Sequence, residues 1–288
     1  MKRAFLMAAA WLIVPAAGSL IMPAASTAQQ PTWHRHEAPT KGGVTVFHSP
    51  QSANLPTAET IDGHLWQFEI SHRFFPALNT GANTLWGLDG PIDNRLGLAY
   101  APTDRLMLTL ERSNLLDNLD LHAKAKLMAR KLGSVPFMAG VQGGVAWNTE
   151  VPGRRAADSR NVQFYGMVIL NALVGNRVAL GLVPSYLRNP QVELPQADNA
   201  LGLGMYTQVY FGKGFSALGE WNVSQSRAGL EHDAGTFGVE LETGGHFFKI
   251  VLSNSTRLNP AQYLGGTPFT FKPSEWRLGF NITRLLVK

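Results

Sequence analysis

Apolar side chains alternate with small or polar ones along the chain from Leu65 onward. In segment 65–74 one set is Trp66, Phe68, Ile70 and Phe74, and the other is Gln67, Glu69, Ser71 and Arg73. Successive side chains of a β-strand point to opposite faces, so this alternation predicts a strand that separates an apolar environment from a polar one. The same division recurs in segments 236–243 and 276–283.

Continuing this pattern along the chain predicts twelve strands in all. The others lie near 94–101, 106–113, 118–130, 136–147, 161–173, 178–188, 199–211, 215–224 and 246–254. Most have about the 9 to 11 residues that a tilted transmembrane strand needs. After the N-terminal segment, no stretch reaches the roughly 20 apolar residues of a membrane-spanning helix, so a membrane span would have to be built from strands.

The connections between these strands alternate in length. Short links are predicted at 102–104, 133–134, 175–176, 212–214 and 244–245, and longer ones at 75–93, 148–160, 189–198, 225–234 and 255–274. A membrane barrel has short turns at its periplasmic end and longer loops at its outer end, whereas a soluble sandwich has no reason to sort its loops. The link 114–117 departs from this rule, because it is short where a long loop is expected.

Together these patterns predict an all-β fold, namely a closed antiparallel transmembrane β-barrel of about 12 strands over residues 65–288. With an even number of strands, both ends of the barrel domain lie on the periplasmic side. The predicted barrel faces lipid with its apolar residues and its own lumen with its polar ones. Closure leaves no strand edge unpaired inside the bilayer.

The N-terminal residues 1–28 have the features of a signal peptide. Lys2 and Arg3 form a basic start, residues 4–14 are apolar, and small residues at 26–28 suit a cleavage site. The alternative is a retained membrane anchor, which two prolines and the short apolar core oppose. We therefore expect export and an outer-membrane location.

Residues 29–64 are polar, proline-containing and irregular, with one β-prone patch at 44–47. This segment is predicted to be a periplasmic leader that precedes the barrel and forms no domain of its own.

Composition narrows the possible classes of protein. The chain has 288 residues, of which 45% are hydrophobic and 16% charged, so it is too apolar for a disordered protein. It contains no cysteine, which excludes disulfides, thiolate metal sites and thiol enzymes. Without Lys2 and Arg3, 23 basic residues face 20 acidic ones, an excess too small to indicate nucleic acid as a partner. The 29 glycines suit a crowded, curved sheet.

The polar faces of the predicted strands carry charges of both signs. The candidates for lining the lumen are Glu69, Arg73, Arg95, Glu111, Asp120, His122, Lys124, Lys126, Glu220, Glu240, Glu242, Lys249 and Arg277. One interpretation is a water-filled pore with a weak ion preference. The favoured one is that these side chains pair across a narrow lumen and hold it closed, because twelve strands enclose limited space.

No catalytic group can be assigned from these residues. Glu240 and Glu242 share a strand face, but any polar inner face produces that spacing. Ser71 and His72 are adjacent, so in a strand they point to opposite faces and cannot act as nucleophile and base.

The sequence also predicts no cofactor and no metal. His34, His36 and the neighbouring Glu37 could bind a metal, as could His246, but no established metal-site spacing accompanies them.

Several strings resemble, as a set, an uncharacterised bacterial family of β-barrel proteins that is known as a domain of unknown function. They are residues 55–60 (LPTAET), 69–74 (EISHRF), 87–90 (GLDG), 94–100 (NRLGLAY), 119–124 (LDLHAK), 184–186 (PSY), 242–246 (ETGGH) and 277–282 (RLGFNI). The resemblance covers residues 43–286. It implies an outer-membrane barrel without an assigned reaction, and therefore no catalytic residue to carry over. The chain ends in Leu286, Val287 and Lys288 where many outer-membrane barrels end in an aromatic residue.

We expect the protein to be an outer-membrane barrel that acts as a narrow channel or as a structural or binding scaffold. The expected partners are outer-membrane lipid and, during biogenesis, the barrel-assembly machinery. Two alternatives remain open. One is an outer-membrane enzyme acting on lipid, and the other is a soluble periplasmic barrel that holds an apolar ligand inside and has polar residues outside.

Overall fold

The computed structural model describes residues 44–212, 214–243 and 246–286. The predicted signal peptide and the first part of the predicted leader, up to residue 43, lie outside the described residues. Among the residues described, no helix has the length and apolar character to cross a membrane.

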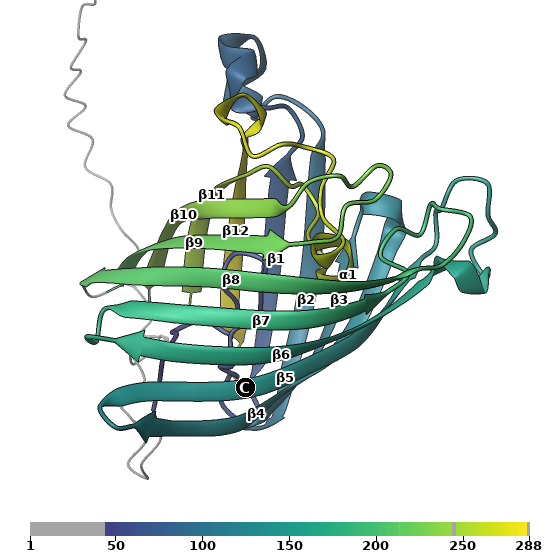
Figure 1. Ribbon diagram of the computed structural model, residues 1–288. Helices are drawn as coiled ribbons and strands as arrows, with labels where there is room; N and C mark the ends of the chain where they lie inside the picture. Colours follow the sequence, from purple (N-terminus) through teal and green to yellow (C-terminus); the bar gives the residue numbers. More distant parts are fainter. Residues whose placement is uncertain (1–43, 213, 244–245, 287–288) are drawn as a thin grey trace, which may run out of the picture. The chain divides into compact units, whose positions relative to one another are not determined.

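Twelve antiparallel strands form a closed barrel (Figure 1). They are β1 (Trp66–Phe74), β2 (Ile92–Thr103), β3 (Leu106–Ser113), β4 (Asn118–Leu132), β5 (Val135–Asn148), β6 (Val162–Val174), β7 (Val178–Arg188), β8 (Asn199–Gly212), β9 (Phe215–Val223), β10 (Ala234–Thr243), β11 (His246–Ser253) and β12 (Arg277–Leu286). Each strand pairs with the next along the chain, and β1 pairs with β12 to complete the ring. The predicted fold class and strand number are confirmed.

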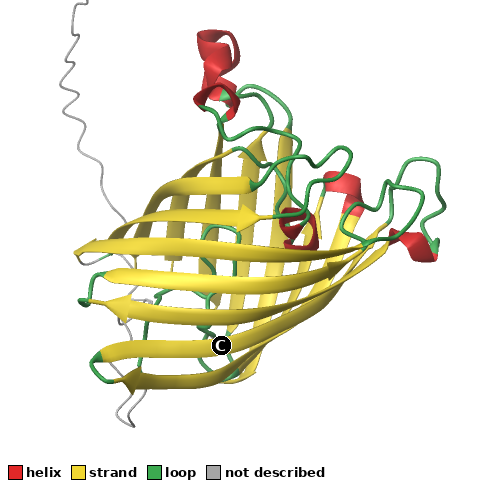
Figure 2. Cartoon of the chain, viewed as in Figure 1, coloured by secondary structure: helices red, strands yellow, loops and turns green. Residues whose placement is uncertain are grey.

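The strand connections are sorted between the two ends of the barrel, as predicted. One end carries tight turns, such as the one at Gly175 and Asn176, both of which have a φ of 57°. The other end carries the longer loops and every short helix of the described residues (Figure 2). These helices are η1 (Leu78–Gly87), η2 (Leu115–Asp117), η3 (Ser159–Asn161), α1 (Pro260–Leu264) and η4 (Pro273–Glu275). We refer to the two ends as the turn end and the loop end.

The exceptional link between β3 and β4 is indeed short and lies at the loop end. Helix η2 makes the reversal, with Leu116 and Asp117 at φ values of 58° and 46°. The strand order is therefore unbroken at the one place where the predicted count could have failed.

The outer face of the barrel is apolar. Large side chains that are exposed on it include Leu96, Leu98, Leu108, Leu110, Leu121, Phe164, Leu201 and Ile250. Facing lipid removes such groups from water, whereas in solution they would form a very large apolar patch. This face does not fit the soluble barrel considered above, which requires polar residues outside.

The inner face has two different halves. On β1–β4 and β9–β12 it carries buried charged and polar residues, as the alternation predicts. On β5–β8 it is mainly apolar and aromatic, with Met138, Ala146, Tyr165, Met167, Ile169, Ala179, Val183, Leu187, Tyr206 and Tyr210. The same strands also bury the polar residues Gln142, Asn148, Gln163, Asn171, Ser185 and Gln208. The expectation of a polar inner face therefore holds only in part for these four strands. The reason lies in the segment that occupies the lumen.

Candidate functional site

Residues 44–62, which precede β1, lie inside the barrel, and we call this segment the plug (Figure 1, purple). Its apolar residues Val46, Phe47, Leu55 and Ala58 join one buried cluster with the inner face of β5–β8. Phe47 meets the ring of Tyr206 edge to face, with centroids 5.2 Å apart. The apolar half of the inner face is thus covered by the apolar side chains of the plug.

Polar contacts from the barrel wall, in place of strand pairing, hold the plug. Its one β-bridge joins Gln51 to Pro56 within the plug itself. The backbone groups of such a segment still need partners in a buried environment. Barrel side chains provide them.

Glu220 on β9 binds residues 53–55, which we call the tip of the plug. Its Oε2 accepts hydrogen bonds from the backbone N–H groups of Ala53, Asn54 and Leu55, at 3.1, 3.1 and 3.3 Å. Its Oε1 accepts from Nδ2 of Asn54 at 2.5 Å. Successive backbone N–H groups that converge in this way form an anion-binding nest, so a carboxylate is the side chain that suits the position.

Two lysines bind the segments on either side of the tip, residues 44–52 and 56–62, which we call the arms of the plug. Nζ of Lys249 donates to the carbonyl oxygens of Gln51 at 2.6 Å and Ser52 at 2.5 Å, and it lies 3.2 Å from Oε2 of Glu240. Nζ of Lys124 donates to the carbonyl oxygens of Pro50 at 2.7 Å and Thr57 at 3.1 Å. Both ammonium groups are therefore used to tie down plug carbonyls.

Neutral and cationic side chains complete the attachment. Arg73 donates to Oδ1 of Asn54 at 2.9 Å, and Asn281 donates to the carbonyl oxygen of Ala53 at 2.7 Å. On the apolar half, the hydroxyl of Tyr206 donates to the carbonyl oxygen of Pro56 at 2.8 Å. Plug and wall are thus matched in both apolar and polar groups.

One inner-face glycine makes this last contact possible. A Cβ on Gly181 would lie 2.1 Å from the ring carbons of Tyr206, so only glycine lets that ring lie flat across β7.

At the turn end, His48 and Glu59 of the plug contact side chains of the wall. Nδ1 of His48 lies 2.6 Å from Oε2 of Glu242, and the imidazole stacks on Tyr210 at a centroid distance of 4.3 Å. Glu59 accepts from the backbone N–H of Val46 at 3.0 Å and lies 3.3 Å from Nζ of Lys126. The carboxylate of Glu59 therefore joins both arms of the plug to the wall.

The loop between β11 and β12 enters the barrel from the loop end. All five residues of α1 are buried. The carbonyl oxygens of Tyr263 and Leu264 accept from Nδ2 of Asn222 at 3.4 and 3.3 Å, and that of Leu258 accepts from Arg95 at 2.8 Å. Burial raises the pKa of the Tyr263 phenol well above its ordinary value. The lumen is therefore filled from both ends.

Farther along the same loop, Glu275 accepts hydrogen bonds from the hydroxyl and the backbone N–H of Thr270. These bonds hold the pKa of the Glu275 carboxyl below its ordinary value. Next to it, the guanidinium of Arg277 lies 3.5 Å from the ring centroid of Phe269. Polar and aromatic contacts therefore fix this loop at the rim of the loop end.

The thirteen candidate lumen residues have three placements. Those that contact the plug are Arg73, Arg95, Lys124, Lys126, Glu220, Glu242 and Lys249. Those that contact other barrel side chains are Glu69, Glu111, Asp120, His122 and Glu240. Arg277 lies at the loop-end rim. Eleven of the thirteen are buried, and Lys126 and Glu242 are partly buried.

Neither the apolar half of the inner face nor the plug was recognised from the sequence as part of a site. The one available signal was the apolar patch at 44–47 in an otherwise polar leader, which the structure buries. Ser71 and His72 do point to opposite faces, since Ser71 is buried and donates to Glu69 while His72 is partly exposed.

Comparison with solved structures finds barrels of similar fold. An outer membrane channel from Pseudomonas putida F1 is 14% identical, with 80% of this chain and 98% of that chain covered and a TM-score of 0.50. The KdgM porin is 10% identical over 76% of this chain and 98% of that chain, with a TM-score of 0.49. The NanC porin is 11% identical over 78% and 99%, with a TM-score of 0.46. At these identities the likeness concerns the fold.

Comparison with curated proteins gives no match. A family model described as "Membrane bound beta barrel domain (DUF5777)" matches residues 47–286, a range that takes in most of the plug together with all twelve strands. The plug is accordingly part of the family's domain. The chain belongs to this family of membrane-bound β-barrel domains.

Proposed function

We propose that this protein is an outer-membrane channel that its own N-terminal segment holds shut. The observation that carries the proposal is the plug, a segment of the same chain that fills the lumen and is attached by polar contacts to the wall. Side-chain contacts of this kind can break one by one without disturbing the strand ladder. The barrel wall can therefore stay intact while the plug leaves.

An outer-membrane location fits a closed barrel with an apolar outer face and an N-terminal segment that has the features of a signal peptide. The outer membrane channel of similar fold agrees with a transport role. We propose no reaction for the protein.

The opened lumen would have a charged wall on one side. Arg73, Lys124 and Lys249 would lose their plug partners, as would Glu220. Arg95, Lys126 and Glu242 also contact the plug, so its removal exposes five cationic groups and two anionic ones to the pathway. We expect the open channel to favour small anionic solutes, because fixed charges lining a pore set its ion preference.

A disulfide lock tests the channel. Ala53 of the plug shares a buried apolar cluster with Val251 of β11 and Leu218 of β9. Because the chain has no cysteine, an A53C/V251C double variant carries a single possible disulfide. In planar bilayers we expect the oxidised protein to stay closed at every voltage. The reduced protein should open at high voltage and show anion preference.

The single A53C and V251C variants serve as matched controls, since neither can form the intramolecular bond. Opening that is equally frequent before and after reduction would refute the plug as the gate. Complete silence of the reduced protein, of the controls and of a variant lacking residues 44–60 would refute the channel itself and favour a closed scaffold.

A further inference from the structure

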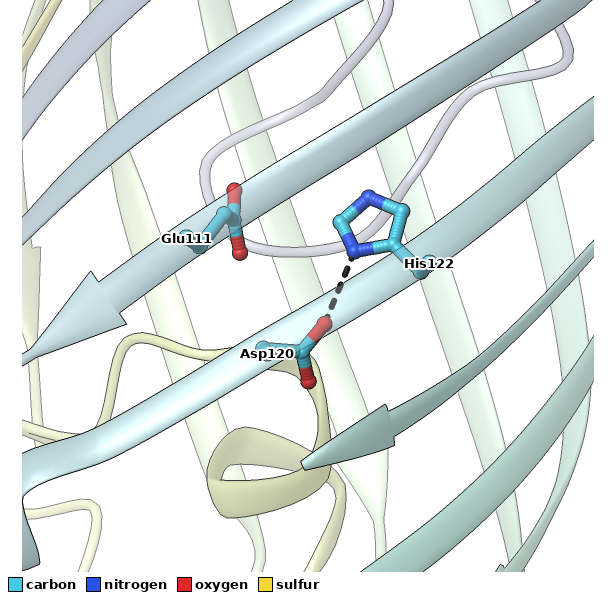
Figure 3. Close-up of side chains that lie close together, drawn as sticks. All are labelled: Glu111, Asp120 and His122. Carbon is cyan, nitrogen blue, oxygen red and sulfur yellow. Dashed lines mark hydrogen bonds and ion pairs between the residues drawn. The ribbon is translucent and has the colours of Figure 1, made fainter. Parts of the chain in front are cut away.

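Glu111, Asp120 and His122 gather on the inner face of β3 and β4, on the charged half of the barrel (Figure 3). Glu111 lies directly opposite Asp120 in the β3–β4 register, and His122 follows two residues later on the same face. One ligand atom from each side chain lies within 4.8 Å of the others, and all three residues are buried. Figure 3 shows the three side chains converging from the two strands.

The charge of this cluster is not balanced by the side chains around it. Like charges directly opposite each other on neighbouring strands are unfavourable, and burial raises the cost. Arg95 is the nearest cation, with Nε 3.6 Å from Oε1 of Glu111. Its guanidinium is already bound by Glu69, Ser71 and the carbonyl oxygen of Leu258. One guanidinium thus faces several carboxylates.

Polar atoms at the cluster also lack partners among the described residues. Oε2 of Glu111 and Oδ2 of Asp120 are both buried without a hydrogen bond. Oγ1 of Thr109 is also buried without a hydrogen bond. Thr109 is 6% exposed and pairs with His122 in the strand register. A buried carboxylate oxygen without a partner costs free energy, so each such atom calls for a compensating group.

A small cavity lies beside Glu111 and Thr109. It has a volume of about 40 Å³, and its lining includes Thr109, Glu111 and His122 from the wall and Gln51 from the plug. That volume accommodates an ion or a few water molecules. Nδ1 of His122 lies 2.9 Å from Oδ1 of Asp120. This contact places Nδ1 of His122 on the same side as the carboxylate, so Nδ1 is the ring nitrogen that can share an ion with it.

We propose that Glu111, Asp120 and His122 bind a divalent transition-metal ion, with Thr109 or water from the cavity as a further ligand. One imidazole and two carboxylates suit Zn²⁺ or Mn²⁺, and their charge compensates the two facing carboxylates. The ion would join β3 to β4 at the wall of the cavity that the plug closes. It would therefore exchange slowly with solution. This site is independent of whether the barrel conducts.

Metal titration of the full-length protein in detergent tests the proposal. After treatment with a chelator, the protein is titrated with ZnCl₂ and with MnCl₂ by calorimetry, and the metal content is measured by mass spectrometry. We expect one ion per chain. The E111Q and D120N variants, which keep the side-chain size, should each bind at least tenfold more weakly, because each loses a ligand.

Two controls separate this site from others. E240Q removes an equally buried inner-face carboxylate that pairs with Lys249, and it should bind metal as the native protein does. The H34N/H36N variant removes the histidine pair that the sequence offers as an alternative, and it too should bind normally. Heat-dependent gel migration checks that each variant is folded.

X-ray absorption spectroscopy of the loaded native protein keeps the proposal testable even if E111Q or D120N fails to fold. We expect oxygen ligands and a single imidazole. Two imidazoles, no stoichiometric binding of either ion, or unchanged affinity in folded E111Q and D120N would overturn the proposal. The absence of binding would indicate that the facing carboxylates share a proton.

Discussion

Replacing Glu220 with glutamine should release the plug, and the structure sets the size of the effect. The carboxylate accepts four hydrogen bonds from the tip of the plug, three of them from backbone N–H groups. Glutamine has the same shape but no charge, and its amide offers one acceptor oxygen while its NH₂ group points hydrogens at the donors. Hydrogen bonds to a charged group contribute about 1.5–3 kcal/mol each, and neutral ones about 0.5–1.5 kcal/mol.

Losing the charge and one acceptor should therefore cost the plugged state about 2–4 kcal/mol, since the remaining oxygen still accepts some of the bonds. At about 1.4 kcal/mol per tenfold change, the released population rises roughly 30-fold to several hundred-fold. This estimate concerns the plug alone, because the strand ladder around β9 is unchanged.

Cysteine labelling measures this population directly. Ala53 is completely buried, so an A53C variant reacts with a water-soluble maleimide only when the plug leaves the lumen. In the E220Q background the labelling rate should rise by the same 30-fold or more. The matched control is E69Q, because Glu69 is also a buried inner-face carboxylate but bonds to Ser71 and Arg95 of the wall. A folded E220Q protein that labels less than about threefold faster than the E69Q control would refute the reasoning.

Three other perturbations have defined outcomes. K249M should lower the free energy of unfolding by about 3–5 kcal/mol because it removes the cation beside the buried Glu240. In urea titrations the K249M/E240Q double variant should recover the part of that loss due to the unpaired carboxylate, but not the part due to the lost bonds to Gln51 and Ser52. G181A should destabilise the barrel by about 1–3 kcal/mol, seen as a lower temperature for the heat-dependent gel shift, since the new methyl group would overlap a tyrosine ring. Glu275 has a lowered pKa in the folded state, so its contribution to the free energy of unfolding is present above the unfolded pKa of about 4.3. That contribution is lost as the pH falls through the lower folded pKa. The fluorescence of the neighbouring Trp276 should therefore stay constant from pH 7 to about pH 5 and change below about pH 4.

The barrel could be predicted from the sequence because alternate residues of a membrane strand face lipid and the lumen, and therefore differ in polarity. The segment 65–74 shows this plainly, and β1 occupies nearly the same residues. The alternation of short and long connections then predicted that neighbouring strands pair in chain order and that turns and loops lie at opposite ends of the barrel. The tight link at 114–117 could be read as an exception but not explained, because its left-handed residues Leu116 and Asp117 belong to no turn signature that is specific in sequence.

The contents of the lumen could not be predicted in the same way. The tip of the plug is bound by Glu220, some 166 residues away along the chain, and no local pattern reports such a contact. The apolar half of the inner face was hidden because β6 and β8 carry runs such as Met167 to Leu170, which are apolar on both faces. Such runs locate a strand but do not say what lies against its inner side.

The candidate metal cluster of Glu111, Asp120 and His122 could be predicted only in part. Asp120 and His122 share a strand face, which the sequence reveals, but the register that brings Glu111 opposite Asp120 depends on the turn between β3 and β4. All three residues were therefore predicted to face the lumen, without any indication that they meet.

The plug is joined to β1 by residues 63–65 alone, and the backbone N–H of His64 at that link donates to the carbonyl oxygen of Ala101 at 2.6 Å. A plug that leaves the lumen therefore remains tethered at the mouth of its own barrel. Its return is an intramolecular event governed by a local concentration on the order of millimolar, whatever the amount of protein in the membrane. Reclosure should follow first-order kinetics that are indifferent to dilution, which distinguishes a built-in stopper from an inhibitor supplied by another molecule.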